Sequence, residues 1–92
     1  MNKTWWSDSS GRIEFQLYDT HVDELQGGDN LPYIQEIMPK YEDVFNMIDE
    51  KLLINTAIEY GCKDYGSEGT PTLKEAKEFI LWCALWETYD NI

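Results

Sequence analysis

Near the amino terminus the sequence reads Arg12-Ile13-Glu14-Phe15-Gln16-Leu17-Tyr18, an alternation of polar and apolar residues. Such an alternation is typical of a strand with its apolar side chains on one face and its polar side chains on the other. The preceding Asp8-Ser9-Ser10-Gly11 favours a turn, because Asp and Ser side chains bond to the local backbone and glycine tolerates a positive φ. We therefore predict a hairpin that pairs Thr4–Ser7 with Arg12–Tyr18, with Trp5 and Trp6 pointing to opposite sides.

Two longer segments have helical periodicity. Apolar residues spaced by about 3.6 positions predict a helix over Tyr41–Tyr60, with acidic residues at its start and Gly61 just beyond its end. Thr72-Leu73-Lys74-Glu75 has the form of a capping box and predicts a second helix from Leu73 to about Tyr89. The middle of this second helix has no polar residue, so we expect it to lie at the centre of the fold or to carry a partner surface.

The segment between the hairpin and these helices is more polar. We expect residues 19–31 to form a connector, and Pro32–Met38 to form a helix of one or two turns that Pro39 stops. The predicted fold is α+β, with an N-terminal hairpin packed on two main helices in a single domain over residues 1–92. A mainly helical domain with an irregular amino terminus is the alternative.

The charge balance narrows the choice of partners. The chain has 18 acidic and 7 basic residues among 92, a net charge of −11, so direct binding to nucleic acid or to an anionic membrane is disfavoured. Its aromatic content of 14% favours a folded domain over a disordered acidic chain. No stretch has the apolar character of a signal peptide or a membrane span, and we expect a cytoplasmic protein. Cys62 and Cys83 are then expected as reduced thiols, with a single disulfide as the alternative.

The acidic residues are unevenly distributed. No Lys or Arg lies between Ile13 and Pro39, and only Lys40 and Lys51 interrupt the acidic residues that follow. Carboxylates on a folded scaffold can be spaced similarly to the phosphates of a nucleic acid, which would suit a groove rich in Lys and Arg. A solvated acidic face that only maintains solubility is the alternative. The candidate partner-binding carboxylates are Glu14, Asp19, Asp23, Glu24, Asp29, Glu36, Glu42, Asp43, Asp49 and Glu50.

Aromatic residues give a second indication of a partner surface. Trp82 and Trp86 fall on one face of the predicted carboxy-terminal helix, and tryptophan is frequent among the residues that dominate binding energies. We include both as candidate partner-binding residues. The alternative is that they belong to the core, where most tryptophans are largely buried.

Catalytic and metal-binding patterns are weak. His21-Val22-Asp23-Glu24 is a possible fragment of a metal site, but it lacks a second His or a Cys at ligand spacing, and we predict an exposed connector histidine. Asp8-Ser9-Ser10-Gly11 lacks the two anchor carboxylates of a calcium-binding EF-hand loop. We expect no catalytic residues and no cofactor. A small metal-dependent enzyme at His21, Asp23 and Glu24 remains the hypothesis from another class.

In its size, acidity and aromatic content the chain resembles two groups of small inhibitor proteins. One group is the phage-encoded anti-CRISPR proteins, several of which occupy nucleic-acid-binding surfaces of CRISPR effector complexes. The other is the bacterial immunity proteins that neutralise basic nuclease toxins. The first resemblance implies an inhibitor, in the host cytoplasm, that covers a basic surface of a CRISPR effector subunit and blocks target DNA binding. The second implies an inhibitor that covers a basic surface in the same way, with a nuclease toxin as the partner.

Overall fold

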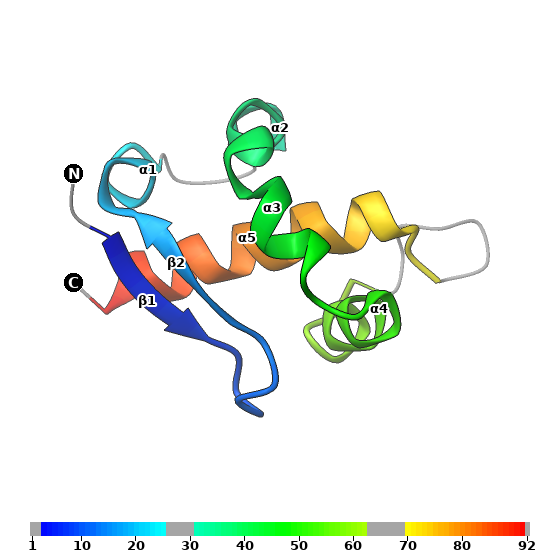
Figure 1. Ribbon diagram of the computed structural model, residues 1–92. Helices are drawn as coiled ribbons and strands as arrows, with labels where there is room; N and C mark the ends of the chain where they lie inside the picture. Colours follow the sequence, from blue (N-terminus) through cyan, green and yellow to red (C-terminus); the bar gives the residue numbers. More distant parts are fainter. Residues whose placement is uncertain (1–2, 26–30, 63–69, 92) are drawn as a thin grey trace.

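A computed structural model describes residues 3–25, 31–62 and 70–91. Figure 1 shows one long helix, α5, that crosses the molecule from end to end, with the hairpin and the other helices arranged around it. The predicted α+β class is confirmed, including the N-terminal hairpin. The elements in chain order are β1 (Lys3–Ser7), β2 (Glu14–Tyr18), α1 (Asp19–Asp23), α2 (Leu31–Ile37), the 3₁₀ helix η1 (Met38–Tyr41), α3 (Glu42–Asn46), α4 (Glu50–Glu59) and α5 (Leu73–Asp90).

The two strands pair antiparallel, with a register that runs from Lys3 opposite Tyr18 to Ser7 opposite Glu14. The connection is held by the buried carboxylate of Asp8, which accepts a hydrogen bond from the backbone N–H of Ile13 at 2.8 Å. Gly11 has a φ of 74°, a conformation that costs glycine little. The turn is thus confirmed, although β2 begins at Glu14 rather than at Arg12.

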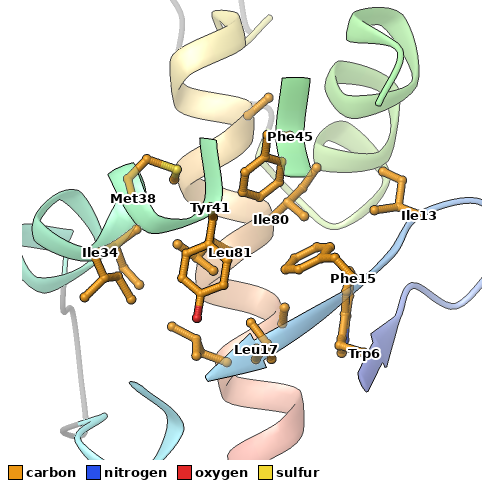
Figure 2. Close-up of a cluster of buried hydrophobic side chains, with 14 of the residues drawn as sticks. Trp6, Ile13, Phe15, Leu17, Ile34, Met38, Tyr41, Phe45, Ile80 and Leu81 are labelled. Carbon is orange, nitrogen blue, oxygen red and sulfur yellow. The ribbon is translucent and has the colours of Figure 1, made fainter. Parts of the chain in front are cut away.

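One face of the hairpin packs on the helices. Ile13, Phe15 and Leu17 are all fully buried, as the alternating pattern predicts. Figure 2 shows these side chains in a cluster with Tyr41 and with residues of α2, α3 and α5. The rings of Phe15 and Phe45 lie 5.2 Å apart between centroids, which joins the hairpin to α3.

The carboxy-terminal helix begins with the predicted capping box. Thr72 accepts from the Glu75 N–H, and the Glu75 side chain accepts from the Thr72 N–H. Near the other end, the Trp6 indole N–H donates to the Glu87 carboxylate at 2.6 Å and ties β1 to α5. The helix is central, as its apolar middle predicts, and its fully buried side chains are Ala76, Ile80, Leu81, Ala84 and Leu85.

The prediction of one continuous helix over Tyr41–Tyr60 is wrong. The segment is split into α3 and α4, and Asp49 adopts an extended conformation between them. The Asp49 carboxylate accepts from the Leu52 N–H at 3.0 Å and caps α4. An Asp can satisfy the free amides of a new helix start, which allows a break that apolar spacing alone does not reveal.

The prediction of a connector over residues 19–31 is also wrong in its first part. Asp19–Asp23 forms α1, and its Val22 side chain is buried in the core. The short helix α2 starts at Leu31, and the chain then passes Pro39 as the 3₁₀ helix η1 instead of stopping. Proline is compatible with that continuation because it lies in the first turn of η1, where its missing N–H has no intrahelical partner. Gly27-Gly28 lies outside the described residues.

Candidate docking surface

Most of the predicted carboxylates are accessible. Asp19 and Glu42 are half-buried, and Asp29 lies outside the described residues. The candidate carboxylates are distributed over five elements, from β2 to the start of α4, and so do not belong to the face of one helix. Those that are exposed are Glu14, Asp23, Glu24, Glu36, Asp43, Asp49 and Glu50.

Several of these carboxylates also hold the fold together. Asp19 accepts a hydrogen bond from the Thr4 hydroxyl and so links α1 to β1. Glu42 lies 3.8 Å from the Lys77 ammonium on α5, and Asp49 caps α4. Substitution of these residues would therefore also affect the stability of the fold.

Other carboxylates are engaged less deeply or not at all. Glu14 accepts from the Trp5 indole at 3.3 Å, and Glu24 accepts from the Tyr33 hydroxyl at 3.1 Å. Within the described residues, no hydrogen bond or ion pair is formed by Asp23, Glu36, Asp43 or Glu50. These last four side chains are therefore the most available for a partner.

Exposed apolar side chains lie beside the acidic residues. Trp5 is 58% exposed and Met47 is 88% exposed, and both line a shallow groove of about 400 Å³ between the hairpin and α3. Sequence reasoning missed Met47, because it lies at the break between α3 and α4 that periodicity did not predict. The alternation in β1 did indicate that either Trp5 or Trp6 would face solvent. The same groove is also lined by Lys3 and Lys40, so this region is not purely acidic.

Trp82 and Trp86 are half-buried and pack against the core cluster. They belong to a row of rings along α5 in which successive centroids, from Phe79 through Trp82 and Trp86 to Tyr89, are 5.9, 6.2 and 5.6 Å apart. Both side chains therefore belong partly to the core. The part of each ring that is still exposed leaves apolar surface on α5 for a partner to contact.

The prediction that His21 is an exposed histidine is wrong. Its ring is buried, and its Nδ1 atom lies 2.7 Å from the hydroxyl of Tyr41. That hydroxyl also accepts a hydrogen bond from the Tyr18 N–H at 3.1 Å, and the direction of its hydrogen bond with His21 follows the tautomer of the ring. Burial and the nearby Lys40 lower the pKa of His21, while Glu24 acts in the opposite direction. The histidine is therefore neutral at pH 7 and serves the packing of α1.

The two cysteines, both within the described residues, lie in surroundings that suppress the reactivity of their thiols. Both cysteines are free and buried, and burial raises the pKa of Cys62 to about 11 and that of Cys83 to about 12. Such thiols are protonated at neutral pH and are poor nucleophiles. Across residues 3–25, 31–62 and 70–91, no three His, Cys, Asp or Glu side chains gather as they would around a metal ion.

No helix in the described part of the chain combines the length and apolar character needed to cross a bilayer. Comparison of the chain with protein-family models, with curated proteins and with solved structures finds no match.

Proposed function

We propose that this chain is a stoichiometric inhibitor that covers a basic, nucleic-acid-binding surface of another protein. The observation that supports the proposal is the exposure of the acidic stretch: seven of its carboxylates face solvent on a folded scaffold, and four of these make no bond within the described residues. Carboxylates held in place can pair with the Lys and Arg side chains that otherwise bind phosphates.

Charge alone would give fast but weak association, and affinity normally comes from a few well-packed anchors. Trp5 and Met47 are suited to this role because both project from the fold, and Glu14 beside them supplies part of a charged rim. The proposed docking surface therefore combines an apolar centre between the hairpin and α3 with carboxylates on the neighbouring elements. This combination favours a specific partner over an acidic surface that serves only solubility.

The resemblance to anti-CRISPR proteins makes a CRISPR effector complex the first partner to test. Purified effector is loaded with its guide and a fluorescent target DNA, and the chain is added before or after the DNA. We expect the chain to prevent DNA binding in proportion to its molar ratio, and to lose this effect as salt rises, because exposed charge pairs are screened.

The second class of inhibitor, the immunity proteins, is tested in parallel by an assay with a nuclease toxin that has a basic active face. Inhibition of the toxin but of no effector would assign the chain to immunity proteins. If neither nucleic-acid-binding protein is inhibited at low salt, the proposed function is wrong.

A further inference from the structure

Two adjoining cavities lie between the short helices α2 and η1 and the first half of α5. Their volumes are about 270 and 480 Å³, and both are lined by Gln35, Lys74 and Glu78. They therefore form one continuous groove. The smaller cavity lies at the end nearer to Trp82, and its apolar wall is formed by Leu31, Ile34, Phe79 and Trp82.

The groove contains a carboxylate without a partner. Glu78 is only 8% exposed, yet it makes no hydrogen bond or ion pair with any residue in the described part of the chain. Its carboxylate oxygens are not among the fully buried side-chain atoms that lack a partner, so they remain open to the groove that Glu78 lines. A cation that enters the groove can therefore pair with this carboxylate.

The other charges around the groove are already engaged or lie at its mouth. Lys77 pairs with Glu42 at 3.8 Å, and Glu75 is occupied by the capping box with Thr72. Lys74 is exposed, so its ammonium reaches solvent while its stem covers the wall. Lys74 and Glu78 both line the smaller cavity, and of these two Lys74 is exposed whereas Glu78 is only 8% exposed.

The wall beside Glu78 is aromatic. The rings of Phe79 and Trp82 are stacked, with centroids 5.9 Å apart and an angle of 29° between their planes. A planar cation can lie on the face of such a ring while it forms two parallel hydrogen bonds to a carboxylate. Guanidinium meets both requirements better than ammonium, because it is flat and more weakly hydrated.

We propose that the groove between α2 and α5 receives an arginine side chain of the partner, whose guanidinium pairs with Glu78 and stacks on Trp82. Glu78 and Trp82 both line the smaller cavity, whose volume of about 270 Å³ is sufficient for one side chain. The proposal rests on the proposed function in that the arginine belongs to the basic partner. It adds a second anchor, on a part of the molecule distinct from the Trp5 and Met47 groove.

The pocket can be tested without the partner. N-acetyl-arginine methylamide is titrated into the ¹⁵N-labelled chain, and the Trp82 indole N–H signal, assigned by its loss in Trp82→Phe, is followed. We expect a saturable shift of this signal. The citrulline analogue, which has nearly the same shape and no charge, should cause no saturable shift. Equal binding of both analogues, or of neither, would overturn the proposal.

Glu78→Gln removes the charge with little change of shape, and we expect it to weaken arginine binding by roughly tenfold to a hundredfold. Asp90→Asn, which removes an exposed carboxylate at the far end of α5, is the control and should bind as the wild type does. If Glu78→Gln disturbs the fold, Trp82→Leu tests the other contact, followed through the Phe79 amide signal. Undiminished binding by a folded variant of either residue would overturn the proposal.

Failure of this proposal is distinguishable from failure of the proposed function. A chain that blocks DNA binding but shows no arginine-specific shift retains the inhibitor function and lacks the arginine pocket. A chain that binds the arginine probe but inhibits neither nucleic-acid-binding protein has the pocket without the proposed function.

Discussion

Asp8 is the residue on which the hairpin turn depends. Burial raises the pKa of its carboxyl, but hydrogen bonds from the Ser10 hydroxyl and from backbone N–H groups, including that of Ile13, outweigh burial and leave the pKa below its ordinary value of 3.8. The folded state therefore binds this proton less readily than the unfolded state does. The stabilisation is present at pH values above 3.8 and is lost as the pH falls through the lower pKa of the folded state.

We expect Asp8→Asn to lower the free energy of unfolding at pH 7 by about 1.5 to 3 kcal/mol, because charged hydrogen bonds in a buried site are lost. Urea unfolding at pH 7 and at pH 3 measures the effect, and the difference between variant and wild type should shrink at the lower pH. Asp43→Asn, at an exposed position, is the control and should change little. A constant difference at both pH values would contradict this role for Asp8.

His21 makes stability depend on pH in a different range. The pKa of its buried ring is lower than the ordinary 6.5, so protons favour the unfolded state. The stabilisation is complete at pH values above 6.5 and falls as the pH drops towards the lower pKa of the folded state. We expect the wild type to be less stable at pH 5 than at pH 7.5, and His21→Gln to show a smaller difference between these two pH values. An unchanged difference in the variant would show that His21 is not responsible.

At the scale of elements, the sequence predicted regular strands and helices more accurately than the breaks within helical segments. The hairpin and α5 were found because alternation over 12–18 and the capping box at Thr72 are local patterns with a direct physical meaning. The break at Asp49 was missed, because an N-cap inside an apolar repeat has the same spacing as a continuous helix. The sequence did not predict α1, because His21 is a core residue only by its contact with Tyr41, which lies twenty positions further along the chain.

The break before α4 gives a prediction at this scale. Asp49→Ala removes the cap of α4, and we expect a loss of about 1 kcal/mol in unfolding free energy. Asp49→Asn should recover most of it, since the amide oxygen can accept the same hydrogen bond from Leu52. Thermal unfolding of the two variants measures the difference, and equal melting temperatures for alanine and asparagine would contradict the capping role.

At the scale of the whole molecule, the sequence predicted which half carries the acidic residues, but not how they are used. Three of these carboxylates make bonds that depend on the fold and cannot be distinguished from the others in the sequence. Asp19 bonds to Thr4, Glu42 pairs with Lys77, and Asp49 caps the helix at Leu52. The exposed position of Met47 and the burial of Glu78 likewise depend on how helices meet. The number of charged residues can be counted in a sequence, whereas the bonds that each charged side chain makes depend on tertiary packing.

The central claim, docking through the acidic stretch, needs variants with matched charge. Glu36→Lys with Asp43→Lys changes two free carboxylates of that stretch, and Glu59→Lys with Asp90→Lys changes two exposed carboxylates outside it. Each pair replaces two negative charges by two positive ones, so both shift the net charge by four units, from −11 to −7. Both pairs lie on the surface, and although Glu59 pairs with Arg12 at 3.1 Å, an exposed ion pair of this kind contributes little stability.

The most direct measurement is inhibition of DNA binding by these two variants at physiological salt, where charges more than about 8 Å apart are largely screened. We predict that the first pair weakens inhibition about tenfold or more, because attraction at the interface becomes repulsion, while the second pair stays close to the wild type. Equal effects of the two pairs would mean that net charge alone acts, and would contradict docking through the acidic stretch.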